Sequence, residues 1–112
     1  MVSGQLVDME ELADMLAYGL PIQPPSERGR DPERERCIRF TSVIGSVEVA
    51  ELVVRKRFVR MNLSKVPEID LLAMSGLEEK PSADDRFEWA AEVRPENALG
   101  ARLLLESVVG LL

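Results

Sequence analysis

A change of hydrophobic period near the C-terminal end constrains the fold more than any other feature of this sequence. Over residues 87–94 the pattern has a period of two, which is typical of a strand with one buried face. The apolar set is Phe87, Trp89, Ala91 and Val93, and the set between is Glu88, Ala90, Glu92 and Arg94. Directly afterwards, over residues 95–112, apolar residues recur at helical spacing. A strand that runs into a helix indicates a domain with both kinds of element.

The terminal helix is predicted to begin at Pro95, because proline is favoured at the first helical position. Its apolar residues include a 3-4-3-4 seam like that of a short coiled coil. The seam consists of Ala98, Ala101, Leu105, Val108 and Leu112. We therefore expect residues 95–112 to form an oligomerisation helix in a homo-oligomer, a dimer or a tetramer. Gly100 and Gly110 weaken the seam, and a plain core helix explains the pattern as well.

At the other end of the chain, residues 5–18 are predicted to form an amphipathic helix. Leu6, Met9, Leu12, Ala13 and Leu16 share one face. Gly19 and Pro21 end it, since glycine accepts a left-handed cap and proline cannot continue a helix. Residues 21–35 carry four prolines and alternating charges, so we expect a solvated loop there.

The middle of the chain is rich in β-branched residues and predicts a hairpin, 36–44 paired with 47–54, followed by an extended basic stretch to Leu63. Gly45-Ser46 suits a two-residue type II′ turn between the two strands. A helix capped by Ser46, with Val47 and Ala50 on one face, is the alternative. Residues 69–74 form a further short apolar element.

The length of 112 residues fits one domain, residues 1–112. We predict an α+β fold with an N-terminal helix, an antiparallel sheet and a C-terminal leucine-rich helix.

The chain lacks most side chains on which catalysis relies. Histidine is absent, so there is no imidazole base or metal ligand, and one cysteine cannot build a zinc site. No phosphate-binding glycine loop or nucleophile elbow occurs. We therefore expect no enzyme, no cofactor and no metal. Cys37, in an apolar strand pattern, is interpreted as a small buried hydrophobe.

The single cysteine and the N-terminal residues indicate the cellular compartment of the protein. A lone cysteine permits no intrachain disulfide, which favours an intracellular protein. The N-terminal residues do not resemble a signal peptide, and no apolar run is long enough to cross a bilayer. We expect a cytoplasmic protein that does not enter a membrane.

The net charge of −6 hides a segregation of charge along the chain. Residues 28–60 hold nine Lys or Arg against five Asp or Glu, a balance of +4, whereas the remaining residues hold five against fifteen, a balance of −10. A polyanion responds to the local field of a patch and not to the mean charge. The basic segment is thus the candidate contact with a polyanion.

Within that segment, Arg55 to Arg60 read R-K-R-F-V-R. If the run is extended, Lys56, Phe58 and Arg60 share one face. Cations along a strand neutralise phosphates, and an aromatic ring stacks on a base for about 1–3 kcal/mol. The predicted nucleic-acid-binding residues are Arg55, Lys56, Arg57, Phe58 and Arg60, joined by Arg36, Arg39, Arg86 and Trp89 if their strands are neighbours.

We therefore predict sequence-independent binding of single-stranded nucleic acid, DNA or RNA. The alternative is a small protein–protein assembly or adaptor domain. In that case the aromatic residues belong to the core and the arginines pair with acidic residues.

The chain resembles the ThermoDBP-related single-stranded DNA-binding proteins of thermophilic archaea. The resemblance rests on R-K-R-F-V-R (Arg55 to Arg60), R-F-E-W (Arg86 to Trp89) and the leucine-rich terminal helix. The arginine-rich, histidine-free and amide-poor composition is similar too, and it suggests a hot-living source. The resemblance implies a mixed α/β fold that is not an OB barrel, a single-strand-binding cleft of basic and apolar residues, and oligomerisation through helices.

Overall fold

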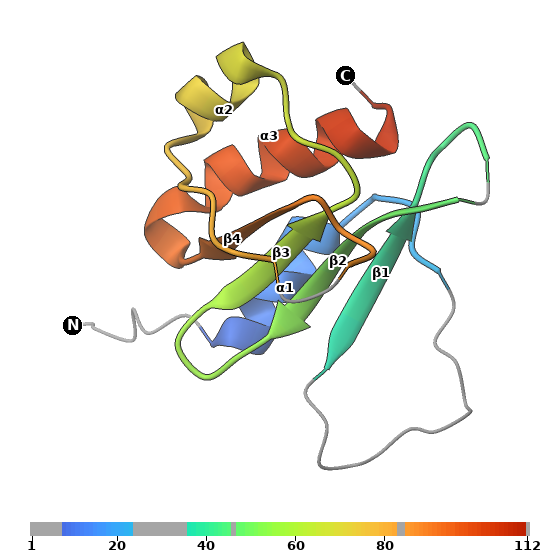
Figure 1. The fold of residues 1–112 in the computed structure, drawn as a ribbon. Coiled ribbons are helices and arrows are strands. Elements are labelled where there is room, and N and C mark those ends of the chain that lie inside the picture. Colours follow the sequence, from blue (N-terminus) through green and yellow to red (C-terminus); the bar gives the residue numbers. More distant parts are fainter. Residues whose placement is uncertain (1–7, 24–35, 46, 83–84, 112) are drawn as a thin grey trace.

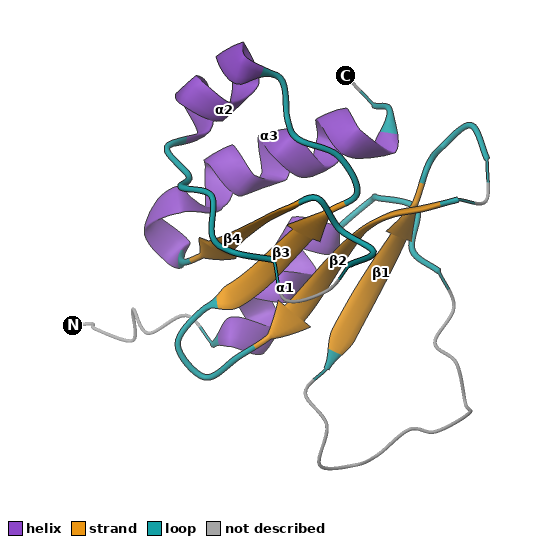
Figure 2. Cartoon of the chain, in the orientation of Figure 1, coloured by secondary structure: helices purple, strands orange, loops and turns teal. Residues whose placement is uncertain are grey.

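A four-stranded antiparallel sheet organises the part of the chain that the computed structural model describes, which is residues 8–23, 36–45, 47–82 and 85–111 (Figures 1 and 2). The strands follow one another in the order β1-β2-β3-β4. The elements are α1 (Met9–Ala17), β1 (Cys37–Thr41), β2 (Glu48–Val54), β3 (Val59–Leu63), α2 (Ile69–Ser75), β4 (Trp89–Val93), the 3-10 helix η1 (Pro95–Asn97) and α3 (Ala98–Val109). The predicted α+β fold is confirmed, and the sheet is open rather than a closed barrel.

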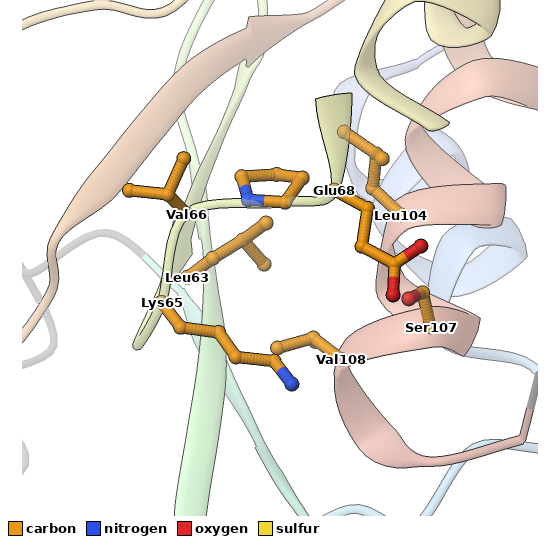
Figure 3. Close-up of a pocket in the computed structure, with 8 residues that line it drawn as sticks. Leu63, Lys65, Val66, Glu68, Leu104, Ser107 and Val108 are labelled. Atoms are coloured by element: carbon orange, nitrogen blue, oxygen red, sulfur yellow. The ribbon is translucent and has the colours of Figure 1, made fainter. Parts of the chain in front are cut away.

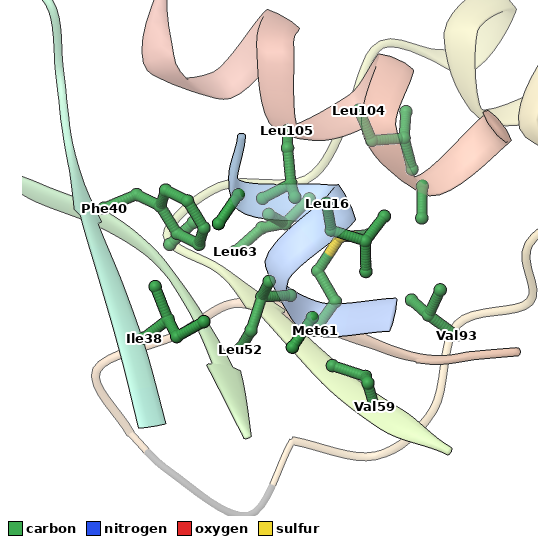
Figure 4. Packing of buried hydrophobic residues seen from close by; sticks show 14 of the residues in the cluster. Leu16, Ile38, Phe40, Leu52, Val59, Met61, Leu63, Val93, Leu104 and Leu105 are labelled. Atoms are coloured by element: carbon green, nitrogen blue, oxygen red, sulfur yellow. The ribbon is translucent and has the colours of Figure 1, made fainter. Parts of the chain in front are cut away.

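The strand register places alternate residues on two faces of the sheet. One cross-strand row is Ile38, Leu52, Met61 and Ala91, and its neighbours on the same face include Phe40, Val59 and Trp89. These side chains are buried together with residues of α1 and α3, including Leu12, Leu16, Leu104 and Leu105 (Figure 4). Helices α1 and α3 therefore cover this face, which holds the hydrophobic core. The opposite face carries Arg39, Glu51, Arg60, Asn62 and Glu92.

Helix α1 is held at both ends. The side chain of Asp8 caps the first turn by accepting a hydrogen bond from the backbone nitrogen of Glu10 at 3.1 Å. At the other end, Arg102 of α3 donates from Nη1 to the carbonyl oxygens of Leu16 (3.1 Å) and Tyr18 (2.5 Å). A guanidinium is a favourable partner for the unsatisfied carbonyls of a helix C-terminus. Arg102 thus ties α1 to α3.

Pro95 begins the 3-10 helix η1, which leads directly into α3 at Ala98, whereas the sequence predicts one helix from Pro95. Gly100 in its first turn lets α2 approach closely, because a Cβ atom at this position would lie 2.0 Å from the carbonyl oxygen of Ser75. At its end, Gly110 adopts a left-handed conformation with φ of 95°, a common helix C-cap. Beside that cap, Val43 donates its backbone N–H to the carbonyl oxygen of Val109 at 2.9 Å.

Most of the elements predicted from local patterns are present in the structure. The hairpin of residues 36–44 with 47–54 is confirmed, and residues 48–54 are strand and not the alternative helix. The strand predicted over residues 87–94 is present as the shorter β4, Trp89–Val93. A helix follows Pro95, and Gly19 has the expected positive φ of 76°. Residues 1–7, 24–35 and Ser46 lie outside the described residues, and with them most of the predicted loop and half of the predicted turn.

Both edges of the sheet have backbone partners. Along β1, Gln23 donates to the carbonyl oxygen of Arg39 at 2.8 Å, and Thr41 donates to that of Pro21 at 3.1 Å. Along β4, Lys80 donates to the carbonyl oxygen of Ala90 at 2.7 Å. Partners of this kind limit the pairing of an edge strand with another chain.

Candidate nucleic-acid interface

The centre of the predicted basic stretch is a tight turn. The backbone nitrogen of Arg55 donates to the carbonyl oxygen of Phe58 at 3.0 Å, which leaves Lys56 and Arg57 at the tip between β2 and β3. The prediction of an extended stretch is therefore wrong for residues 55–58, because the chain reverses there. Figure 1 shows this turn at the end of the sheet where α1 begins. We call residues Arg55 to Phe58 the basic turn.

Three cations of the basic turn are exposed: Arg55, Lys56 and Arg57. Among the residues that the structure describes, no ion pair involves Lys56 or Arg57. Within the described part of the chain, the charges of Lys56 and Arg57 are therefore not cancelled by a contacting carboxylate. Neighbouring exposed cations without a carboxylate partner attract anions from solution.

Phe58 supplies an aromatic ring at the base of the turn. The ring is half-buried, and the guanidinium of Arg94 lies over it, 5.3 Å from the ring centroid. Nη2 of Arg94 also contacts Oε1 of Glu92 at 2.8 Å. Arg94 was not among the predicted site residues, because its place beside Phe58 depends on the pairing of β3 with β4.

Arg60 follows the turn, and its side chain points to the face of the sheet that lies opposite the core. Its Nε donates to Oδ1 of Asn62 at 3.2 Å, and its Nη2 donates to the carbonyl oxygen of Pro81 at 2.5 Å. These bonds hold the segment before β4 against the sheet. Arg60 is the cross-strand partner of Glu92, which contacts the Arg94 that lies over Phe58, so Arg60 and Phe58 lie on the same side of the sheet. Its Nε and Nη2 donors, however, are engaged within the molecule, so we do not count Arg60 among the phosphate contacts.

Arg39 and Arg86 gather around one buried carboxylate on the same face. Glu51 is 5% exposed, and its Oε2 lies 3.3 Å from Nε of Arg39 and 3.6 Å from Nη2 of Arg86. Its Oε1 accepts from Nδ2 of Asn62 at 3.3 Å. Arg86 also pairs with Glu48 at 3.6 Å, which is too long for a hydrogen bond. The two predicted arginines therefore balance internal acids.

Arg36 is likewise paired. Its Nη1 contacts Oε2 of Glu10 at 2.7 Å and its Nη2 contacts Oδ1 of Asp14 at 2.8 Å, so it joins the start of β1 to α1. The hydrogen bonds to Asp14 and then to Glu10 raise the pKa of the Arg36 guanidinium. Its charge is constant at any physiological pH.

The aromatic residues near β4 belong to the interior. Trp89 is 1% exposed and Phe87 is 4% exposed. The prediction that Trp89 stacks on bases is therefore wrong, because the indole packs among core side chains. Its Nε1 is buried without a hydrogen-bond partner among the described residues.

The seam predicted for oligomerisation is also interior. Ala101, Leu105 and Val108 belong to the hydrophobic core of the chain itself, and Ala98 packs against that core. The prediction of an interface on these four residues is wrong, because this stripe faces the home sheet. Leu112 lies outside the described residues.

Two features were missed by sequence reasoning. Cys37 is exposed and not buried, since it lies on the face of β1 opposite to the core.

In addition, five large apolar residues are exposed where α3 ends, and we call them the apolar end: Val43, Ile44, Val47, Val66 and Leu111. The run Val43-Ile44 beside Gly45 was a signal for exposed apolar side chains at a turn.

A small pocket lies beside the apolar end (Figure 3). Its volume is about 80 Å³, and its apolar wall comes from β3, the segment after it and α3. The lining residues are Leu63, Lys65, Val66, Pro67, Glu68, Leu104, Ser107 and Val108. Lys65 and Glu68 thus place one positive and one negative charge at the pocket.

Within the described residues, no helix is both long and apolar enough to span a membrane, and no three acidic or cysteine side chains are grouped to hold a metal ion.

Comparison with known proteins finds no matching family model, no matching curated protein and no matching solved structure. The resemblance to ThermoDBP-related proteins stays a prediction.

Proposed function

We propose that this protein binds single-stranded nucleic acid at the basic turn, without sequence preference. The supporting observation is the distribution of ion pairs. Arg36, Arg39 and Arg86 contact carboxylates within the molecule, whereas Lys56 and Arg57 are exposed and have no ion pair among the described residues. Among the described residues, two neighbouring cations without an ion pair thus lie together in the turn. A polyanion meets that local field, although the chain is acidic overall.

In this proposal Arg55, Lys56 and Arg57 neutralise successive phosphates, and the half-buried ring of Phe58 contacts one base. Arg94, already over that ring, supports its orientation. The site is smaller than the nine residues expected from the sequence. Three phosphate contacts and one ring predict modest affinity and strong dependence on salt.

The test is a titration of labelled oligo-dT followed by fluorescence anisotropy at increasing salt. The plot of log K against log salt concentration should have a slope of about −2, because three neutralised phosphates contribute about −0.7 each for a single strand. The triple variant Arg55→Gln, Lys56→Gln, Arg57→Gln should abolish binding. An absence of binding at low salt by the wild type contradicts the proposal.

A pair of single variants provides the matched control. Lys56→Gln and Lys65→Gln each remove one exposed lysine and change the net charge equally, but only Lys56 lies in the basic turn. We expect Lys56→Gln to reduce the salt slope by about 0.7, which is one phosphate contact. Lys65→Gln should leave the slope unchanged. Equal effects of the two variants would mean that net charge, and not the turn, governs binding.

A further inference from the structure

The apolar end gathers five exposed apolar side chains near the C-terminal end of α3. Ile44 is 91% exposed, Val47 69%, Val66 55%, Leu111 51% and Val43 45%. The hydrogen bond from Val43 to Val109 and that from Ser64 to Val49 hold the β1–β2 loop and the β3–α2 segment at this end of the sheet (Figure 1). Large exposed apolar groups at one place mark contact sites for other macromolecules.

The pocket beside the apolar end limits what can enter it. A cavity of about 150 Å³ takes a benzene ring, and this pocket of about 80 Å³ is about half that size, which suits the end of one small side chain. Leu63, Leu104 and Val108 provide an apolar wall. The fitting occupant is therefore the end of a valine, leucine or isoleucine side chain.

The charges at the pocket indicate which molecule provides that side chain. Lys65 and Glu68 both line it, so a two-fold axis that passes between them can place the lysine of one copy near the glutamate of the other. A surface with one charge of each sign around an apolar centre is complementary to itself, as a two-fold interface requires. The same end also presents Ile44, an aliphatic side chain of suitable size.

We propose that the apolar end joins two copies of this chain about a two-fold axis. Ile44 of each copy enters the pocket of the other, with Lys65 opposite Glu68 at the rim. This dimer uses the end of α3 and not the 98-101-105-108 stripe, which the core occupies. It does not depend on nucleic-acid binding, because the basic turn lies at the opposite end of β2 and β3.

Sedimentation equilibrium of the full chain over a range of concentrations tests the dimer. The wild type should pass from one chain to two, and Ile44→Lys should raise the dissociation constant at least about tenfold, because both buried anchors of the dimer are lost. Leu99→Lys is the matched control, since Leu99 is 90% exposed but lies in the first turn of α3. It should dimerise like the wild type. A wild type that stays a single chain throughout, or equal effects of both lysine variants, overturns the proposal.

Charge reversal gives a second test that leaves the apolar side chains in place. Lys65→Glu should weaken the dimer, because two glutamates then face each other at each rim. Adding Glu68→Lys in the same chain should restore it, since the reversed charges pair again across the axis. Circular dichroism confirms that each variant is folded. A double variant that dimerises no better than Lys65→Glu overturns the two-fold arrangement.

Discussion

Replacing Gly100 with alanine tests the packing of α2 on α3. A Cβ atom at this position would lie 2.0 Å from the carbonyl oxygen of Ser75, and 2.7 Å from its carbonyl carbon. Ordinary C···O contacts are about 3.3 Å or longer. The atoms met are backbone, so the end of α2 must move by more than about 1 Å, since no side-chain rotation relieves the contact.

The free energy of unfolding responds to two opposing effects. Alanine in place of glycine favours a helix by about 0.5–1 kcal/mol, whereas overpacking of a close contact costs about 1–3 kcal/mol. We expect the second effect to prevail and the variant to be less stable by about 1–2 kcal/mol. For a domain of this size that corresponds to a fall in Tm of about 4–8 °C.

Thermal unfolding followed by circular dichroism measures this change. Gly45→Ala is the matched control, because a Cβ atom at Gly45 meets nothing within 4 Å and this glycine has no positive φ. We expect its stability to stay within about 0.5 kcal/mol of the wild type. If Gly100→Ala is as stable as Gly45→Ala or more stable than the wild type, the close approach of α2 to α3 is wrong.

Three further variants test the ion pairs and caps. Arg102→Met removes the donors to the C-terminal carbonyls of α1 and should lower the free energy of unfolding by about 1–2 kcal/mol in urea titrations; an unchanged midpoint would contradict the capping role. Glu51→Ala leaves Asn62 without its buried acceptor and should cost about 1–3 kcal/mol; a neutral effect would show that this network does not support the sheet. Arg36→Met should cost at most about 1 kcal/mol, because the pair is exposed. The loss of stability caused by Arg36→Met should be the same at pH 6 and pH 9. The pKa of the guanidinium is raised in the fold, so the group is charged in folded and unfolded chains alike. A loss that differs between the two pH values would contradict this account of Arg36.

The elements of the fold could largely be predicted from local patterns. The alternation over residues 87–94 identified β4 because Trp89, Ala91 and Val93 are buried on the core face of that strand. The glycines and prolines at the helix ends identified α1 and α3 for equally local reasons. The turn at residues 55–58 was missed because none of its residues is a glycine, proline or asparagine, the usual turn signals.

The candidate site was less predictable, because it depends on contacts between distant residues. The pairing of Arg39 with Glu51 follows from the register of β1 and β2, which no local pattern determines. The apolar stripe of α3 has the same spacing whether it faces a sheet or a second helix. Burial of Trp89 likewise depends on which face of β4 meets the helices.

The most direct test of the proposed function is an ¹⁵N–¹H NMR titration of the protein with oligo-dT, because it locates the contact residue by residue. The account predicts that the largest amide shifts occur in the basic turn, Arg55 to Phe58, and at Arg94, whose guanidinium lies over the Phe58 ring. Amides around Arg39 and Arg86, whose side chains pair with Glu51, should change little. Shifts that centre on Arg39 and Arg86, or no shifts in the turn at saturation, would contradict it.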